Sequence, residues 1–266
     1  MNRDQVIKAI EDSEVAYLTV GFDYTTKIWQ QLWLPLIKNV IDACLHYNAR
    51  LVFFDNIYAI GGDHIGHITE SSPIGPTSKK GEVRASVDKL ILESIERKNL
   101  QAVIARSADF FSAANDKSLL MNLVFNNLAK GKKAQWFCNA KVIHSCSYTP
   151  DLAAGTAILG NTKEAYNQIW NLPTDPQKIT GEQWINLYAQ EMNTSNKYQV
   201  LPAWSLKVLG LFIPILRESH EMLYQYDRDY FFDSSKFSNY FNYTPTTNAM
   251  AVKKTVDQLV NKNTGA

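Results

Sequence analysis

Apolar runs and apolar helical faces alternate along the first part of the chain. A short helix is expected at 2–11, and apolar residues recur at helical spacing over 27–47, where Pro35 could introduce a kink, and over 81–97. Three continuous apolar runs are typical of strands buried on both faces of a parallel sheet: 14-EVAYLTVG-21, 49-ARLVFFDNIYAIGG-62 and 101-QAVIARSADFF-111. Strands and helices that alternate with short links predict an α/β fold with right-handed crossovers.

Beyond residue 111 the expected elements are shorter and more mixed. Helix and strand patterns alternate there, and Thr180 can cap the helix that follows it. The expected elements are a helix at 116–129, a strand at 133–139, a strand, a turn at Pro150 and a helix within 142–160, a strand at 168–174, a helix at 181–192, a strand near 197–201, apolar helices across 203–226 and a last helix at 247–262. We therefore expect a sheet domain at 1–140 and a mixed segment at 141–266 that completes the sheet and forms a smaller lobe.

Composition and charge narrow the class of protein. The chain has 266 residues, of which 45% are hydrophobic and 12% aromatic, enough to bury a full core. The net charge is +1 with scattered Lys and Arg, so we expect no nucleic-acid partner and no membrane partner. The run 208-VLGLFIPIL-216 is too short to span a bilayer, and the charged N-terminus lacks the apolar stretch of a signal peptide. Three cysteines in no paired pattern complete the expectation of a cytoplasmic protein.

Several segments together resemble a known family. They are 51-LVFFDNIYAIGG-62, TE at 69–70, the PxxP loop at 73–76, KGEVR at 80–84, 104-IARSADFFS-112, 144-HSCSYTPDLAAG-155 and 168-QIWNLP-173. In this order they are similar to the extended short-chain dehydrogenase/reductases, the group that holds the NAD-dependent sugar epimerases and dehydratases. The resemblance covers most of the chain. It implies a partial Rossmann-like NAD(P)-binding domain, a substrate lobe, NAD or NADP as cofactor, and a small hydroxyl- or carbonyl-bearing substrate such as a nucleotide sugar.

The catalytic residues of that family are replaced here. The family uses Tyr and Lys in a YxxxK spacing, and the resemblance puts Lys80 and Arg84 at those positions. Asn56 stands where the family has a Ser or Thr at the end of a strand. The implied roles are proton donation by Lys80, a ribose or phosphate contact by Arg84, and polarisation of the substrate oxygen by Asn56. The alternative is a buried ion pair in a retired active site, hence a non-catalytic nucleotide-binding or scaffold protein.

The resemblance implies further contact residues at the ends of the strands and in the lobe. Those expected at the cofactor are Gly21, Arg84, Ser107 and Ala108. Those expected at the substrate are Asp55, Tyr58, Asp109, His144 and Arg217. The alternatives are a strand-end cap for Asp109, a structural role for His144 and a solvated helix face for Arg217. His64, His67 and Glu70 lie in a glycine-rich loop without a helical HExxH frame, so no metal is expected.

The glycine-rich turn that cradles the dinucleotide pyrophosphate in this family has no counterpart in the sequence. The strand at 14–21 corresponds to the fourth strand of the order 3-2-1-4-5-6, which would make it an apolar sheet edge. Natural chains avoid such edges, so we expect that the protein starts upstream of Met1 and that the sequence is an N-terminally truncated fragment. A covering partner chain or a strand rearrangement are the other options. Helices 27–47 and 81–97 are the expected contact of a homodimer.

Overall fold

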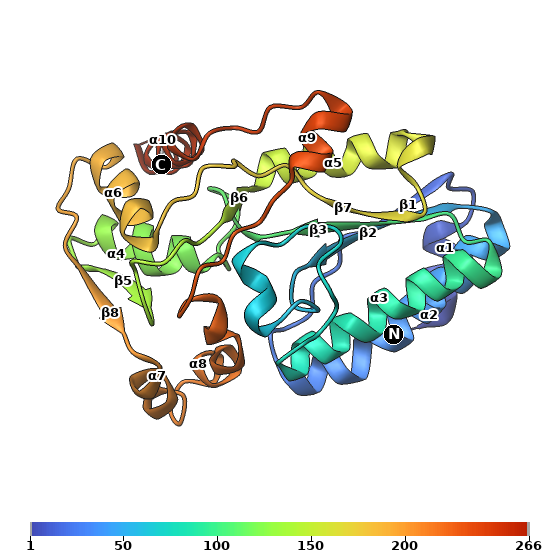
Figure 1. The fold of residues 1–266 in the computed structure, drawn as a ribbon, viewed down its shortest axis with the longest axis horizontal. Helices are drawn as coiled ribbons and strands as arrows, with labels where there is room; N and C mark the ends of the chain where they lie inside the picture. The colour runs from blue at the N-terminus through green and yellow to red at the C-terminus, as the bar shows by residue number, and fades with distance from the viewer. Residues whose placement is uncertain (1, 265–266) are drawn as a thin grey trace. The chain divides into compact units, whose positions relative to one another are not determined.

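The computed structural model describes the backbone of residues 2–264 and the side chains of residues 2–260 (Figure 1). The chain forms two compact units that alternate along the sequence. The first unit comprises Met1–His64, Glu70–Ser107 and Ala153–Leu172. The second unit comprises Ile65–Thr69, Ala108–Leu152 and Pro173–Ala266. The predicted domain boundary near residue 140 remains a prediction. The chain passes between the two compact units several times.

A four-stranded parallel sheet forms the centre of the first unit, in the order β1-β2-β3-β7. Its strands are β1 (Val15–Leu18), β2 (Arg50–Asn56), β3 (Ala102–Ser107) and β7 (Gln168–Asn171). Strands β2 and β3 lie in the middle; every residue of β3 is buried and those of β2 are buried or half-buried, as expected of parallel strands covered on both faces. Among the described strands β1 pairs with β2 alone, so the predicted position at the edge is confirmed.

Long helices cover this sheet. Helices α2 and α3 lie side by side on one face, and residues 153–161 of α5 lie on the other (Figure 1). The relevant bounds are α1 (Arg3–Ile10), α2 (Thr26–Tyr47), α3 (Lys79–Lys98) and α5 (Thr149–Asn161). Thr25 and Ser78 cap the first turns of α2 and α3 with their hydroxyls, and Asn48 and Asn99 end them in the left-handed conformation. The predicted helices are therefore confirmed, with Pro35 accommodated inside α2.

The second unit contains two short parallel sheets, β4 with β6 and β5 with β8. Its strands are β4 (Asp109–Phe111), β5 (Ala134–Phe137), β6 (Cys146–Tyr148) and β8 (Tyr198–Leu201). Its helices are α4 (Asn126–Ala129), α6 (Gly181–Glu191), α7 (Ala203–Leu209), α8 (Pro214–Ser219), α9 (Ser235–Phe241) and α10 (Asn248–Thr264). Thr180 and Gln183 form a reciprocal capping box at the start of α6, which confirms the predicted cap.

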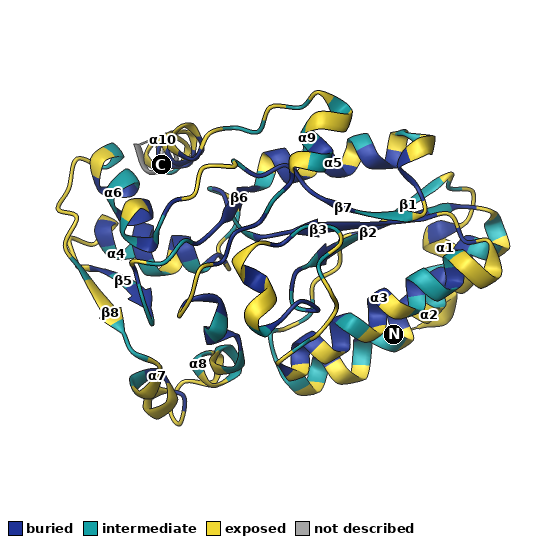
Figure 2. Cartoon of the chain, in the orientation of Figure 1, coloured by how far each residue is buried: buried dark blue, intermediate teal, exposed yellow. Residues whose placement is uncertain are grey.

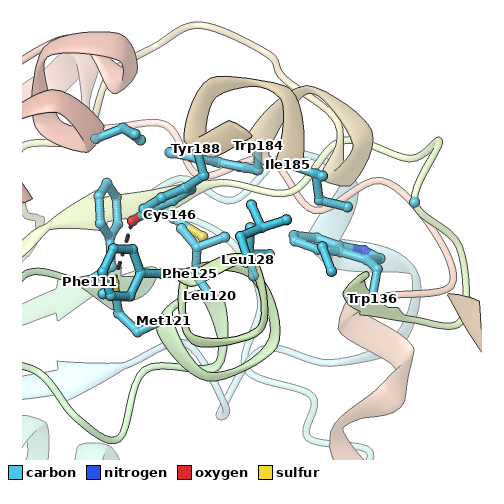
Figure 3. Close-up of a cluster of buried hydrophobic side chains, with 14 of the residues drawn as sticks. Phe111, Leu120, Met121, Phe125, Leu128, Trp136, Cys146, Trp184, Ile185 and Tyr188 are labelled. Carbon is cyan, nitrogen blue, oxygen red and sulfur yellow. Dashed lines mark hydrogen bonds between the residues drawn. The ribbon is translucent and has the colours of Figure 1, made fainter. Parts of the chain in front are cut away.

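Aromatic side chains fill the core of the second unit (Figure 3). Phe111 from β4 meets the indole of Trp184 edge-on, and the Tyr188 ring lies beside it. The Tyr188 hydroxyl lies 3.4 Å from the sulfur of Met121, the one polar contact drawn in the cluster. Figure 2 shows that buried residues line the inner faces of these elements while the outer faces are exposed. This packing gives the unit its own core, separate from that of the first sheet.

Three local expectations from the sequence are wrong. The apolar run at 101–111 does not form one strand, because Ala108 separates β3 from β4 and the two belong to different sheets. Pro150 lies in the first turn of α5, where its missing N–H costs nothing, and not in a turn before the helix. The helix expected at 116–129 begins at residue 119, and its residues Met121–Phe125 are π-helical. Helix α9 was not expected at all.

None of the helices in the described part of the chain is long and apolar enough to cross a bilayer. The dimer expected through helices 27–47 and 81–97 remains a prediction.

Candidate active site

Four buried charged side chains meet beneath the first sheet, where β2, β3 and α3 come together. Asp55 and Arg106 are register partners on the central strands, and Arg84 and Asp88 are one turn apart on α3. Arg106 Nη2 lies 2.6 Å from Asp88 Oδ2, and Arg84 Nε lies 3.4 Å from Asp55 Oδ1. Arg106 Nε lies 3.8 Å from Asp55 Oδ2 and closes the group. Two cations and two carboxyl groups thus form a buried charge quartet.

Burial raises the pKa of Asp55 to about 8. The Asp88 carboxylate acts in the same direction, while the guanidinium groups of Arg84 and Arg106 oppose it. Both oxygens of Asp55 lie without a hydrogen-bond partner among the described residues, since its ion-pair contacts are long. The quartet therefore contains one carboxyl group that can gain or lose a proton near neutral pH.

Arg84 is enclosed by aromatic rings. Its guanidinium carbon lies 4.0 Å from the ring centre of Trp33, 5.2 Å from that of Trp29 and 5.3 Å from that of Phe53. These distances are typical of cation–π contacts, which stabilise a desolvated cation. Asp55 lies beside it, so the contacts of the Arg84 guanidinium are made inside the protein. This geometry favours the structural interpretation of Arg84 over the ribose contact, which remains a prediction.

Lys80 lies in the first turn of α3, and its side chain is fully buried. Its Nζ donates a hydrogen bond of 3.1 Å to Thr26 Oγ1 at the start of α2. The same nitrogen lies 4.6 Å from the ring centre of Tyr24. The Tyr24 hydroxyl in turn donates to the Tyr58 hydroxyl over 3.3 Å. The structure thus brings two predicted residues, Lys80 and Tyr58, into one polar chain.

Asn56 ends β2, and its side-chain oxygen accepts a hydrogen bond of 3.0 Å from the backbone N–H of Tyr58. This contact fixes the amide and leaves its N–H₂ group as a donor for a ligand. Ser107 is buried at the end of β3 and donates to the backbone carbonyl of Asp55 over 3.3 Å. Ala108 is buried directly after it. A polar ligand contact by Ala108 must therefore use the backbone, and the Ser107 hydroxyl is left only as an acceptor.

In the second unit the structure brings Asp109 and His144 together. His144 Nε2 lies 3.1 Å from Asp109 Oδ2, and the Tyr226 hydroxyl donates to the same oxygen over 2.8 Å. The other ring nitrogen of His144 lies 3.1 Å from the carbonyl oxygen of Gln225, and the imidazole stacks on Tyr226 with 4.4 Å between ring centres. His144 is buried, whereas the Asp109 side chain is 27% exposed. Asp109 is thus the accessible member of this pair.

The other residues predicted from the sequence lie outside these clusters. Arg217 is exposed on α8, and no contact with Asp109 or His144 is present in the described part of the chain. His67 Nε2 lies 2.8 Å from Asp233 Oδ2, so it makes a hydrogen bond at the surface. Across the described residues no group of three or more His, Cys, Asp or Glu side chains is placed to hold a metal.

No model of a known protein family matches the sequence, and no curated protein matches it. Solved structures do match its fold. A dTDP-glucose 4,6-dehydratase from Bacillus anthracis in complex with NAD superposes with a TM-score of 0.78 at 16% identity, over 98% of this chain and 77% of that one. A UDP-glucuronic acid 4-epimerase from Bacillus cereus in complex with UDP-glucuronic acid and NAD gives 0.78 at 14% identity, over 98% and 81%. A UDP-glucose 4-epimerase from Thermus thermophilus with NAD gives 0.76 at 14%, over 97% and 82%.

The chain has the extended short-chain dehydrogenase fold. The resemblance stated from the sequence is therefore confirmed at the level of the fold. Identities of 14–16% leave the substrate and the reaction open. The α/β class and the Rossmann-like sheet are confirmed in the same way, by parallel strands with helices on both faces.

The extended short-chain dehydrogenase fold allows a test of whether a dinucleotide fits. Among residues 2–264 no strand, glycine-rich turn and helix follow one another as a pyrophosphate cradle requires. Gly21 is exposed after β1, and a Cβ atom there would meet no protein atom within 4 Å, so the packing of the chain does not demand glycine. The described residues therefore do not provide the pyrophosphate cradle, and the contacts expected at the nicotinamide and the substrate remain predictions.

Sequence reasoning missed Arg106 and Asp88, Thr26 and Tyr24, and Tyr226. Arg106 was visible as a cation inside the apolar run 101-QAVIARSADFF-111, and Asp88 as an acid beside the apolar stripe of its helix. A charge in a continuous apolar run signals a buried partner, because an unpaired buried charge is costly. Thr26 and Tyr226 carry no such local signal, since their partners are distant in the sequence.

Proposed function

We propose that the chain is an atypical NAD(P)-dependent reductase or epimerase of the extended short-chain dehydrogenase type. Its substrate is a small molecule with a hydroxyl or carbonyl group, such as a nucleotide sugar. One observation carries the proposal: a buried Lys80, tied to Thr26, occupies the helix position at which the family resemblance places the catalytic Tyr. The fold shared with NAD-bound epimerases and dehydratases supports the choice of cofactor.

The proposed roles divide between a proton donor and a hydrogen-bond donor. When bound, the nicotinamide supplies or accepts hydride at the substrate carbon. Lys80 gives a proton from Nζ to the substrate oxygen during reduction and takes it back during oxidation. Thr26 holds that nitrogen in place, and the Asn56 amide donates a hydrogen bond to the same substrate oxygen. Asn56 is free for this role because its own oxygen is held by the Tyr58 N–H.

The test is a turnover assay that follows NADH absorbance with candidate sugars, aldehydes and ketones. Lys80→Ala should abolish turnover, and Lys79→Ala, which removes the same side chain one residue earlier, should leave it unchanged. Lys80→Tyr restores the residue of the family and should retain measurable activity. Unchanged turnover in Lys80→Ala would remove the catalytic role of this residue.

A second candidate function is a non-catalytic nucleotide-binding or scaffold protein. The observation that favours it is the enclosure of Arg84 by Asp55 and three aromatic rings, which makes the former catalytic helix part of the core. Such a protein would change NADH fluorescence on binding without any change in NADH absorbance over time. Binding with no turnover for any of the substrate classes would decide for this second function.

A further inference from the structure

Two residues at the start of α2 contact the ammonium group of Lys80 in different ways. Thr26 accepts a hydrogen bond from Nζ over 3.1 Å. The ring of Tyr24, two residues earlier, faces the same nitrogen with 4.6 Å between Nζ and the ring centre. An aromatic face at this distance stabilises a cation that has lost its water. The hydroxyl of Thr26 and the ring of Tyr24 therefore act on one buried charge.

Tyr24 is held in place by the helix that follows it. Thr25 is the N-cap of α2, and its hydroxyl accepts a hydrogen bond from the backbone N–H of Ile28. Tyr24 thus precedes the cap, and Trp29 is the fourth residue of the helix. Their rings meet edge-on with 5.7 Å between the ring centres. This contact is a hydrophobic staple, which fixes the angle at which a chain enters a helix. The position of the Tyr24 ring is therefore determined by local structure.

Tyr24 also connects Lys80 with Tyr58. The Tyr24 hydroxyl donates a hydrogen bond of 3.3 Å to the Tyr58 hydroxyl, and the Tyr58 ring stacks on Trp29 with 6.0 Å between the ring centres. Tyr24 and Tyr58 are half-buried, whereas Lys80 has no exposed surface. Tyr24 thus contacts a buried cation with its ring and a partly exposed phenol with its hydroxyl.

We propose that Tyr24 is a positioning residue, whose ring holds the Lys80 ammonium group and whose hydroxyl holds the Tyr58 phenol in line with it. The inference rests on the proposed function, in which Lys80 gives the proton, and on the substrate contact predicted for Tyr58. Tyr24 acts through these two residues and does not itself contact the substrate. The two contributions can be removed separately, because Tyr24→Phe loses only the hydroxyl and Tyr24→Leu also loses the ring.

The contact between Tyr24 and Lys80 can be measured without turnover. In the full chain with ¹³C-labelled lysine, the ring current of Tyr24 should move the Lys80 Hε resonances upfield of the other lysines. Lys80→Arg assigns these resonances by their absence. Tyr24→Phe should keep the upfield position, and Tyr24→Leu should lose most of it. Tyr47→Leu is the matched control, since Tyr47 is a half-buried tyrosine of the same unit, and it should leave the resonances unchanged.

Kinetic constants separate the hydroxyl from the ring. Tyr24→Phe should raise KM by about fivefold and leave kcat within about twofold, because one hydrogen bond to a substrate contact is lost. Tyr24→Leu should in addition lower kcat by about tenfold, because the ammonium group loses its aromatic neighbour. Tyr47→Leu should leave both constants unchanged. Thermal unfolding of each variant checks that it is folded.

Two results would overturn the proposal. One is a folded Tyr24→Leu variant in which the Lys80 resonances keep their upfield position. The other is a folded Tyr24→Leu variant with the kcat of the unchanged protein. Absence of turnover in the unchanged protein would instead remove the proposed function, and the Lys80 resonances alone would then decide whether Tyr24 holds the ammonium group.

Discussion

Arg106 and Asp88 form an ion pair with 2.6 Å between Nη2 and Oδ2, and both side chains are fully buried. The pair links the central strand β3 to α3, the helix that carries Lys80. A buried pair costs desolvation energy, and removing one partner leaves the other charge uncompensated. The pair therefore gives a sharp test of how the sheet and the helix depend on each other.

Asp88→Asn should lower the free energy of unfolding by about 3–5 kcal/mol, because the Arg106 charge then stays buried without its carboxylate. Urea denaturation of the variant and the unchanged protein measures the difference. The exposed pair of Lys89 and Glu93 on the same helix, at 3.9 Å, is the control. Lys89→Ala should cost less than about 0.5 kcal/mol. Equal effects of the two substitutions would contradict the structural importance of the buried pair.

The pKa of Asp55 predicts a pH dependence of stability. The folded state holds this proton up to a pKa of about 8, whereas the unfolded carboxyl group has a pKa of about 3.9. The contribution is therefore fully present below the unfolded value and is lost as the pH rises through the folded value. Between pH 6 and pH 9 the free energy of unfolding should fall by on the order of 2 kcal/mol from this group.

Asp55→Asn isolates that effect, because Asn mimics the neutral carboxyl group. The variant should match the unchanged protein only near pH 4 and should lose less stability than it between pH 6 and pH 9 in urea denaturation. A loss of about 3–5 kcal/mol at every pH would instead mean that Asp55 is ionised against Arg84 and Arg106 throughout.

Thr26→Val should reduce turnover if Lys80 is the proton donor, since the valine cannot accept the hydrogen bond of Nζ. We expect a decrease of about tenfold in kcat, the size of one hydrogen bond to a charged group. Thr26→Ser keeps the acceptor and should restore most of the activity. Thermal unfolding of both variants serves as the check for folding. Restoration by neither residue type, or full activity in Thr26→Val, would separate Thr26 from the reaction.

Gly181→Ala should destabilise the second unit despite the better helix propensity of Ala. A Cβ atom at this first position of α6 would run into the buried indole of Trp136. The expected loss in the free energy of unfolding is about 1–3 kcal/mol, the usual cost of overpacking. Gly66→Ala is the control, because a Cβ atom there meets nothing within 4 Å, and it should stay within about 0.5 kcal/mol.

Three strands of the first sheet, β1, β2 and β3, could be predicted in sequence order, whereas the position of β7 beside β3 could not. The runs that became β1, β2 and β3 are continuously apolar, and the helices between them carry apolar faces with clear end signals such as Asn48 and Asn99. The strands of the second unit could not be predicted in this way. Its strands are three or four residues long, and the packing of distant aromatic residues decides their pairing.

The candidate site was predictable in its positions and less so in its contacts. Asp55, Lys80 and Arg84 were expected together and lie on adjoining elements of one unit. The partners that define them, Arg106 and Thr26, come from other segments of the chain. Such pairings depend on side-chain direction across a folded sheet, which residue spacing alone does not encode.

The alternation of the two units has a consequence for how the protein is made. Strand β3 receives its second neighbour, β7, only from residues 168–171, after residues 108–152 of the other unit have been synthesised. During translation one side of β3 therefore stays unpaired until β7 has been synthesised, because local contacts cannot complete the sheet. The nascent chain passes through a stage at which a fully buried strand of the final sheet is a potential site of aggregation, and the emergence of β7 from the ribosome ends that stage.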